Sequence, residues 1–174
     1  MKSIKEMNQI EVAAYVITRM EENNIHVTLS GGAATGFFSK NIYVSKDIDL
    51  VNEYQINPEK IRAVMIKIGF IEEGRHYVYP GTNIVVEFPP GPLSVGTESV
   101  KKTEKVELET GSLKIISATD CVKDRLAAFY HWNDRQCLYQ ARLVRKHADV
   151  DLDEIERWSR IEGKLAEYKQ FMNE

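Results

Sequence analysis

A glycine break follows directly after an apolar run and stands shortly before two closely spaced aspartates. Ser30-Gly31-Gly32 ends the run Val27-Thr28-Leu29, and Asp47-Ile48-Asp49-Leu50 follows further along the chain. A glycine pair weakens strands and helices, and carboxylates that share one strand face repel each other. The combination in one short segment indicates a site for phosphates and a cation.

Length and composition place the chain among soluble globular proteins. It has 174 residues, of which 43% are apolar and 28% are charged, which suits one domain or one domain with a helical appendage. The net charge of −3 gives no electrostatic case for nucleic-acid binding by the whole chain. There is no membrane-length apolar run and no signal-peptide core, so we expect a cytoplasmic protein without a membrane partner.

The cysteines and histidines do not indicate a metal site. Cys121 and Cys137 lie in helix-like segments without a Cys-x-x-Cys arrangement, and we expect both to be reduced, packed thiols. The four histidines show no zinc spacing.

Hydrophobic periodicity predicts a mixed α/β part followed by an all-helical part. Helices are expected over residues 6–23, from Gly31 toward Phe38, and over residues 57–68, where Asn57 is the cap and Pro58 the first helical residue. Strands are expected over residues 26–30, 46–51, 70–73, 76–79, 83–88, 106–108 and 113–116. From Ser117 onward the periodicity is helical and proline is absent. We predict a small mixed sheet with flanking helices over residues 1–116 and a helical bundle over residues 117–174, with the active-site cleft between them.

The two aspartates point to the same side of their strand. Side chains alternate across a strand, so Asp47 and Asp49 share one face while Ile48 and Leu50 share the other. Hard divalent cations such as Mg²⁺ take oxygen ligands, often one or two carboxylates together with substrate phosphates. Backbone N–H groups at Gly31-Gly32, where a helix opens, favour phosphate oxygens. The pair of motifs therefore predicts a phosphate and cation site.

Other interpretations of these motifs are plainer. An Asp-x-Asp sequence is common on exposed strand edges, and Gly-Gly is common in ordinary turns. A calcium loop that began at Asp47 would need an oxygen ligand, glycine and glutamate where the chain has Val51, Asn52 and Pro58, so that reading fails. An aspartyl-nucleophile phosphatase would place its aspartates after the first strand, whereas here a strand and the glycine break come first.

The two motifs together resemble the signature of the nucleotidyltransferase superfamily, the polymerase-β-like fold. There a Gly-Gly or Gly-Ser turn precedes an Asp-x-Asp or Asp-x-Glu strand, as Leu29-Ser30-Gly31-Gly32 precedes Ser45-Lys46-Asp47-Ile48-Asp49-Leu50 here. The resemblance continues over residues 118–128, 131–136 and 157–159. It is closest to small bacterial nucleotidyltransferase-like proteins, some of them similar to toxin components of toxin–antitoxin pairs.

The resemblance implies roles for individual residues. It places Asp47 and Asp49 on Mg²⁺ or Mn²⁺, and its best match for a third catalytic and metal-binding carboxylate is Glu87, in the run Asn83–Phe88. A solvent-facing edge glutamate is an equally good reading of Glu87. The residues that it implies at the nucleoside triphosphate are Ser30, Gly31 and Gly32.

The chain departs from the family pattern in two places. Tyr43 stands four residues before Asp47, where many relatives carry arginine, and Glu87 stands where aspartate is commoner. Lys40 and Lys46 are the local cations that would substitute for the arginine, and we assign Lys46 to the nucleotide; a solvated surface lysine is the alternative for each.

In the helical part, two cations are candidates for contact with the nucleotide or the acceptor. These are Lys123 and Arg135, and ordinary surface ion pairs with the neighbouring Asp120, Asp124 and Asp134 are the alternative. We expect Trp132 and Trp158 to be core or helix-interface residues.

The resemblance implies metal-dependent transfer of a nucleoside monophosphate from a nucleoside triphosphate such as ATP to an acceptor hydroxyl. The acceptor is a protein, a tRNA end or a small molecule. The alternative is a catalytically silent binding protein of the same fold, or a toxin–antitoxin component with an antitoxin partner. A homodimer is a further expected assembly.

Overall fold

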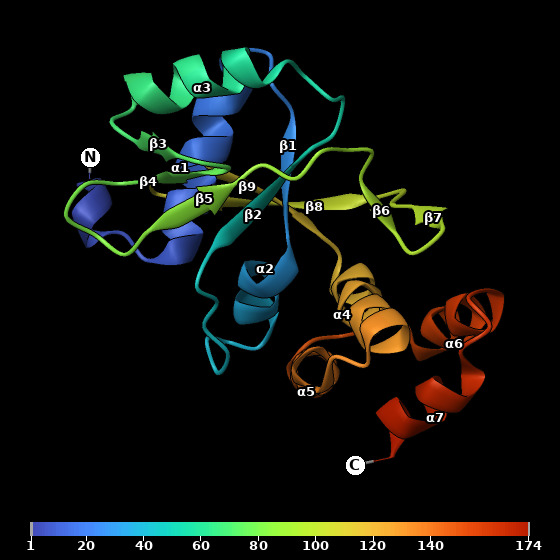
Figure 1. Ribbon diagram of the computed structural model, residues 1–174. Coiled ribbons are helices and arrows are strands. Elements are labelled where there is room, and N and C mark those ends of the chain that lie inside the picture. Colours follow the sequence, from blue (N-terminus) through green and yellow to red (C-terminus); the bar gives the residue numbers. More distant parts are fainter. Residues whose placement is uncertain (1, 174) are drawn as a thin grey trace.

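The computed structural model describes residues 2–173, and its centre is a seven-stranded mixed sheet (Figure 1). The strands lie in the order β3-β4-β5-β2-β1-β9-β8. Strand β1 is antiparallel to β2 and parallel to β9, and β2 is parallel to β5. The strands are β1 Val27–Ser30, β2 Ile48–Asn52, β3 Ile71–Glu73, β4 His76–Val78, β5 Val85–Glu87, β8 Thr103–Leu108 and β9 Gly111–Ile116.

Among the described residues up to Ile116 there are three α-helices. They are α1 Gln9–Glu21, α2 Gly31–Phe38 and α3 Pro58–Lys67, and a 3-10 turn, η1 Ile4–Glu6, precedes them. Helix α1 packs on β1, β2 and β9, and α3 packs on α1 and β3. The caps of α3 are as predicted: Pro58 is the first helical residue, and the Asn57 side chain accepts a hydrogen bond from the backbone N–H of Glu59 at 2.9 Å.

Alternation along the strands gives the sheet one buried and one more open face. In β2, Ile48 and Leu50 are fully buried on the face that α1 covers, whereas Asp49 is half-buried on the opposite face. In β5, Val86 is fully buried while Val85 and Glu87 are half-buried. The half-buried positions of both strands therefore share the open face.

After Ile116, every described element is a helix. These elements are α4 Ala118–Trp132, α5 Arg135–His147, α6 Leu152–Ile161 and α7 Leu165–Met172. Helices α4 and α5 pack against α2, and α6 packs on α4 and α7. Helix α2 begins at the end of β1 and packs on β1, β2, α4 and α5. It therefore lies between the sheet and the helical region (Figure 1).

The observed architecture confirms the predicted fold class, a mixed sheet with flanking helices followed by a helical C-terminal region. The division into two domains at residue 117 stays a prediction. The strand predicted over residues 46–51 begins two residues later, because Lys46 and Asp47 lie in a bend that precedes β2. A short hairpin, β6 Ser94–Val95 and β7 Glu98–Ser99, was not predicted. No helix within residues 2–173 is long and apolar enough to cross a membrane.

The two tryptophans have opposite environments. Trp158 is fully buried, and its ring stacks on Tyr130 at 5.6 Å between centroids, as expected for a core residue. Trp132, at the end of α4, is 78% exposed, so the expectation of a core or interface position is wrong for this residue. Helical periodicity alone does not reveal that α4 ends at Trp132. The next residue, Asn133, has a left-handed conformation that ends the helix before α5.

Both cysteines are free and buried, as predicted. Cys121 packs under α2, where its sulfur lies 3.7 Å from Oγ1 of Thr35. Burial raises the pKa of the Cys121 thiol to about 12, so this thiol stays protonated.

Candidate active site

The turn between β1 and α2 brings a backbone segment against a carboxylate. Gly31, the first residue of α2, has φ +66°, a left-handed conformation that favours glycine. A Cβ added to Gly31 would lie 3.1 Å from Cγ of Asp49 and closer still to Oδ2. At Gly32, an added Cβ would lie 2.5 Å from Oγ of Ser45. Both glycines are therefore required by close approach, and the start of α2 lies directly beside the aspartate.

One row of polar side chains crosses the open face of the sheet. The strand registers pair Ser30 with Asp49, Asp49 with Glu87, Glu87 with His76, and His76 with Glu73. Directly paired residues point to the same face, with Cβ atoms about 5 Å apart. The register thus brings together three of the residues predicted from the sequence, Ser30, Asp49 and Glu87, and adds His76.

Asp47 lies one step along from this row. It directly precedes β2 and is half-buried, and its Oδ1 accepts a hydrogen bond from Oγ of Ser45 at 3.4 Å. Because Asp47 precedes β2, strand alternation does not fix the direction of its side chain. Its negative charge raises the pKa of Asp49, so the two carboxylates lie near each other.

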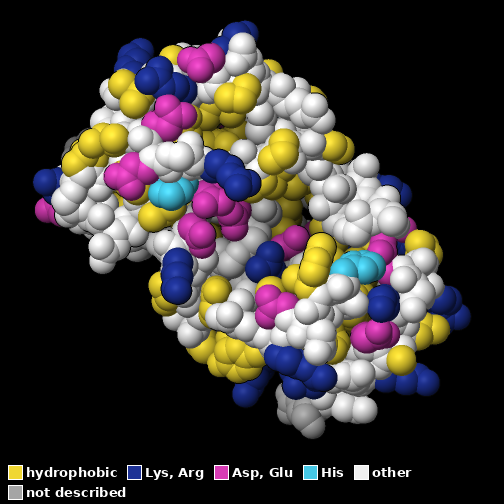
Figure 2. Space-filling view, viewed as in Figure 1, with side chains coloured by type: hydrophobic (Ala, Val, Ile, Leu, Met, Phe, Trp, Pro, Cys, Tyr) yellow, Lys and Arg dark blue, Asp and Glu magenta, His cyan; other side chains and the backbone are white. Residues whose placement is uncertain are grey.

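The electrostatics of the row are dominated by carboxylates. Burial, and then the negative charges of Asp47 and Glu87, raise the pKa of Asp49 to about 6. Arg125 of α4 opposes this rise, and Asp124 adds slightly to it. Figure 2 shows acidic side chains gathered on the sheet beside a hollow that faces the helical region. The row is a place where a cation would relieve repulsion.

Arg125 is held firmly on the helical side of this site. Its guanidinium donates to Oδ2 of Asp124 at 2.5 Å and to Oε1 of Gln140 at 3.4 Å, and it lies 3.8 Å from the sulfur of Cys137. Its side chain is 17% exposed. A guanidinium fixed in this way presents its remaining N–H groups in a set direction, which suits the recognition of phosphate oxygens.

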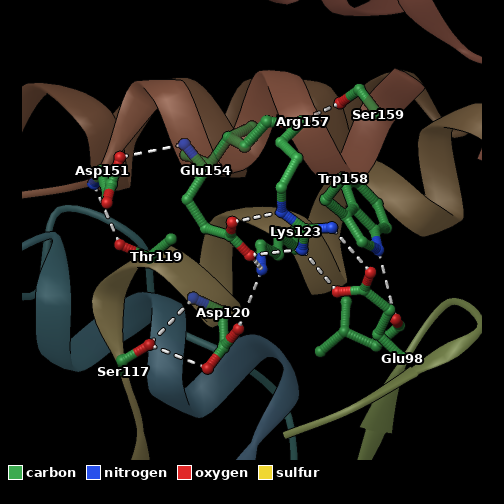
Figure 3. Close-up of polar contacts among 12 residues, drawn as sticks. Glu98, Ser117, Thr119, Asp120, Lys123, Asp151, Glu154, Arg157, Trp158 and Ser159 are labelled. Atoms are coloured by element: carbon green, nitrogen blue, oxygen red, sulfur yellow. Dashed lines mark hydrogen bonds and ion pairs between the residues drawn. The ribbon is translucent and has the colours of Figure 1, made fainter. Parts of the chain in front are cut away.

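The three other predicted nucleotide contacts have different surroundings. Lys46 is exposed in the bend before Asp47. Lys123 is 5% exposed and donates to Oε1 of Glu154 at 2.5 Å, with Asp120 at 3.5 Å (Figure 3). The guanidinium of Arg135 lies over the ring of Phe129, 5.3 Å from its centroid. The structure thus brings Ser30, Gly31, Gly32, Asp47, Asp49 and Glu87 together, but it places Lys123 in a separate ion-pair network.

That network joins α4, α6 and the hairpin β6–β7. Arg157 of α6 donates to both carboxylate oxygens of Glu98, at 2.9 and 2.7 Å, and it also donates to Glu154, which in turn holds Lys123 (Figure 3). Nε1 of Trp158 donates to the carbonyl oxygen of Val95 at 3.3 Å. These contacts fasten the hairpin to the helical region.

Sequence reasoning missed two groups at the site, Arg125 with Asp124, and His76. The Asp124-Arg125 pair was visible on the predicted helix, but only the packing of α4 against α2 brings it near enough for its charges to affect the pKa of Asp49. His76 was visible in a predicted strand, but only the β4–β5 register aligns it with Glu87. What the sequence does not show is which of these distant segments contact each other in the fold.

The carboxylates fit a hard divalent cation that is shared with a substrate. Within residues 2–173, no group of three or more His, Cys, Asp or Glu side chains is arranged to hold a metal ion by itself. Asp47 and Asp49 nevertheless supply neighbouring oxygen donors. The pKa of Asp49 is raised first by burial and then by the charges of Asp47 and Glu87, and a cation would remove the second of these effects. Mg²⁺ typically binds through one or two carboxylates together with substrate phosphates and water, and this donor set has that form.

Comparison with known proteins gives a structural likeness only. No protein-family model and no curated protein sequence matches the chain. The crystal structure of an antigenic nucleotidyltransferase-like protein from Paracoccidioides brasiliensis matches with a TM-score of 0.58 and 14% identity, over 78% of this chain and 75% of that one.

Two structures of another protein match over more of the chain. The crystal structure of ANT(2'')-Ia in complex with adenylyl-2''-tobramycin has a TM-score of 0.54 and 13% identity, and covers 94% of this chain and 98% of that one. The solution structure of the antibiotic-resistance factor ANT(2'')-Ia has a TM-score of 0.52 and 14% identity, over 89% and 95% of the two chains. Taken with the glycine turn and the paired aspartates, these likenesses show that the chain has the fold of the nucleotidyltransferases.

Proposed function

We propose that the protein transfers a nucleoside monophosphate from a nucleoside triphosphate to an acceptor hydroxyl, in a reaction that depends on Mg²⁺ or Mn²⁺. The observation that carries the proposal is the contact between Gly31 and Asp49. It joins a helix start, which favours phosphate, to a carboxylate, which favours a cation. A triphosphate with its cation satisfies both.

The start of α2 would receive the triphosphate. The first N–H groups of an α-helix have no partner within the helix, and its N-terminus carries partial positive charge. Ser30 at the cap position makes no side-chain hydrogen bond to these groups. Gly31 and Gly32 carry no side chain that would keep a phosphate away from them.

Asp47 and Asp49 would hold the cation, with Glu87 as a further carboxylate of the same row. A bound Mg²⁺ would supply charge neutralisation at the phosphate oxygens. Arg125 would contact the triphosphate from the helical side, and would supply the positive charge that Tyr43 does not. In the reaction, the acceptor oxygen forms a bond to the α-phosphorus, the bond from the α-phosphorus to the bridging oxygen breaks, and pyrophosphate leaves. Glu87, which pairs with Asp49 across β2 and β5, would accept the hydroxyl proton.

The structural likeness to ANT(2'')-Ia supports this reaction class, because that protein was captured with adenylyl-2''-tobramycin, a nucleotide joined to a hydroxyl-bearing compound. At 13% identity the likeness supports the fold alone, so it does not identify the acceptor of this chain.

Incubation with Mg²⁺ and each of the four nucleoside triphosphates, labelled at the α-phosphate, tests the proposal. We expect transfer of label to an acceptor with stoichiometric release of pyrophosphate, and loss of both in Asp47→Asn and Asp49→Asn. Release of single phosphate in place of pyrophosphate would assign a different reaction.

A catalytically silent binding protein, for example one partner of a toxin–antitoxin pair, is the second candidate. It is favoured by the lack of a preformed cage of three or more metal ligands within residues 2–173, and by Tyr43 at the position of the family arginine. In that case a triphosphate with Mg²⁺ would cause no thermal shift, or would bind without release of pyrophosphate. Growth arrest on expression that survives Asp49→Asn would support the toxin role.

A further inference from the structure

An open groove lies beside the bend that precedes Asp47 and beside the hairpin β4–β5. Its volume is about 700 Å³, within the range of small-molecule sites. Its walls are the segment after η1, the bend before Asp47, and the hairpin β4–β5. The lining residues are Met7, Asn8, Gln9, Val44, Ser45, Lys46, Val78, Thr82, Asn83, Ile84 and Val85.

The floor of the groove continues the open face of the sheet. Val78 pairs with Val85, one step along from the pair of His76 with Glu87, so both valines share the face of Glu87. Two other lining residues, Ser45 and Lys46, directly precede Asp47 in the chain, and Val85 lies two residues before Glu87. The groove therefore lies next to the segments that carry Asp47 and Glu87.

The lining is apolar and neutral-polar. Five of the lining side chains are apolar, and five carry amides or hydroxyls. Lys46 is the charged side chain among the described lining residues. Val44 is 67% exposed, so its side chain is accessible to a molecule in the groove. Such a surface favours a molecule with an uncharged, partly apolar body. No carboxylate is among the described lining residues, so the groove offers no ion pair to a cationic amine.

The reaction geometry places the acceptor at this end of the site. In an in-line displacement the attacking and leaving oxygens lie on opposite sides of the phosphorus. If the leaving pyrophosphate lies at Gly31 and Gly32, beside β1, the acceptor approaches from the opposite side, toward β5 and β4. The groove floor at Val85 and Val78 lies on that side.

We propose that this groove is the acceptor site, and that the acceptor is an uncharged small molecule with an apolar body and a reactive hydroxyl. The proposal rests on the proposed function for the identity of the reaction, but the chemistry of the groove stands without it. The acceptor hydroxyl at the end of the groove would attack the α-phosphorus, pyrophosphate would leave toward the start of α2, and the hydroxyl proton would pass to Glu87.

Binding of an uncharged dye tests the groove without any nucleotide. N-phenyl-1-naphthylamine increases its emission in apolar surroundings, and we expect saturable binding to the full chain. Val44→Asp, in the bend before Asp47, and Val85→Gln, on the floor, should each weaken it by about fivefold, which corresponds to about 1 kcal/mol of apolar contact. Ile66→Asp is the matched control: Ile66 is 46% exposed on α3, outside the groove, and its substitution should leave dye binding unchanged.

Displacement of the dye then tests the acceptor class. We expect 4-phenyl-1-butanol, an uncharged alcohol, to displace the dye, and tobramycin, a polycation, to leave it bound at the same concentration. Better displacement by tobramycin, failure of the alcohol to displace, or dye binding that both groove variants leave intact would each overturn the proposal. Melting temperatures of the variants show whether a loss of binding is a loss of fold.

The same samples separate this proposal from the proposed function. If the dye and the alcohol bind the groove but no triphosphate binds with Mg²⁺, the proposed reaction fails while the groove remains a binding site for uncharged molecules. If triphosphates bind and the groove variants change nothing, the proposed function stands and the acceptor site lies elsewhere.

Discussion

The carboxylate of Asp49 lies against the backbone of Gly31, so closely that a side chain on Gly31 would collide with it. This contact joins the end of β1 to the middle of the sheet, because Ser30 and Asp49 are also direct register partners. It fixes the position of a carboxylate relative to the free N–H groups of a helix start. The proposed chemistry depends on that relationship.

Replacing Gly31 tests it directly. Gly31→Ala should abolish Mg²⁺-dependent triphosphate binding, because the new methyl group displaces the Asp49 carboxylate. Gly74→Ala is a matched control, since Gly74 also has φ +66° but an added Cβ meets nothing within 4 Å. Both changes should cost about 1 kcal/mol of stability from the left-handed backbone, and Gly31→Ala should cost more. Equal stability losses in the two variants with normal binding in both would contradict the account. Calorimetric titration and thermal unfolding measure the two effects.

The raised pKa of Asp49 predicts how stability depends on pH. Burial and the charges of Asp47 and Glu87 raise the pKa of this carboxyl from 3.8 to about 6, with Arg125 opposing and Asp124 adding to the rise. The folded protein therefore binds this proton more tightly than the unfolded chain. Its stabilising effect is present below pH 4 and is lost as the pH rises toward 6, by an amount on the order of 2 kcal/mol.

Asp49→Asn should remove this pH dependence. Without metal, the variant should be more stable than the parent protein above pH 6, and the difference should shrink toward pH 4. Denaturant unfolding between pH 4 and pH 8 in the presence of a chelator measures it. A variant that is less stable than the parent at pH 8 would show that Asp49 makes structural hydrogen bonds and is not a strained ligand.

Substitution of Lys123 tests whether this residue contacts the nucleotide or stabilises the fold through ion pairs. The sequence predicts a nucleotide contact, whereas the structure gives the ammonium group two carboxylate partners, Glu154 and Asp120. Lys123→Ala would leave these carboxylates without their buried cation and should cost about 2 kcal/mol of unfolding free energy. Arg160→Ala, which breaks an exposed i,i+4 pair with Glu156, should cost under about 0.5 kcal/mol. Unchanged stability in Lys123→Ala together with weakened nucleotide binding would restore the sequence-based role.

The same substitution at two arginines tests which of them contacts phosphate. Arg125→Lys keeps the charge but loses the planar fork, and we expect triphosphate affinity to fall about tenfold. Arg135→Lys should change it less than about twofold, because the Arg135 guanidinium lies over Phe129. Titration of both variants with one triphosphate in Mg²⁺ decides between them. A larger effect at Arg135 would move the phosphate contact to the start of α5.

Local patterns in the sequence predicted most of the elements that build the site. The glycine pair predicted the helix start at Gly31, and the alternation of Asp49 with Ile48 and Leu50 predicted the half-buried position of Asp49, since both depend on residues that are near in sequence. Asp47 lies before the strand, so the shared strand face stays a prediction for this residue. The Asn57-Pro58 cap predicted the start of α3. These features follow from backbone geometry alone.

What the sequence could not show depends on contacts between distant segments. The register that aligns His76 with Glu87 is set by pairing across a hairpin, and a slip of one residue would place His76 on the opposite face. The approach of Arg125 to Asp49 depends on how α4 packs against α2. The exposure of Trp132 depends on where α4 ends, because a helical pattern does not fix its last turn.

Calorimetric titration of the four nucleoside triphosphates, with Mg²⁺ and with a chelator, into the parent protein and Asp49→Asn tests the central claim most directly. The account predicts that at least one triphosphate binds the parent protein in Mg²⁺, that this binding weakens at least tenfold when the cation is removed, and that Asp49→Asn loses the Mg²⁺-dependent part. Equal binding by the parent and the variant, or the absence of any triphosphate binding to the parent protein in Mg²⁺, would contradict it.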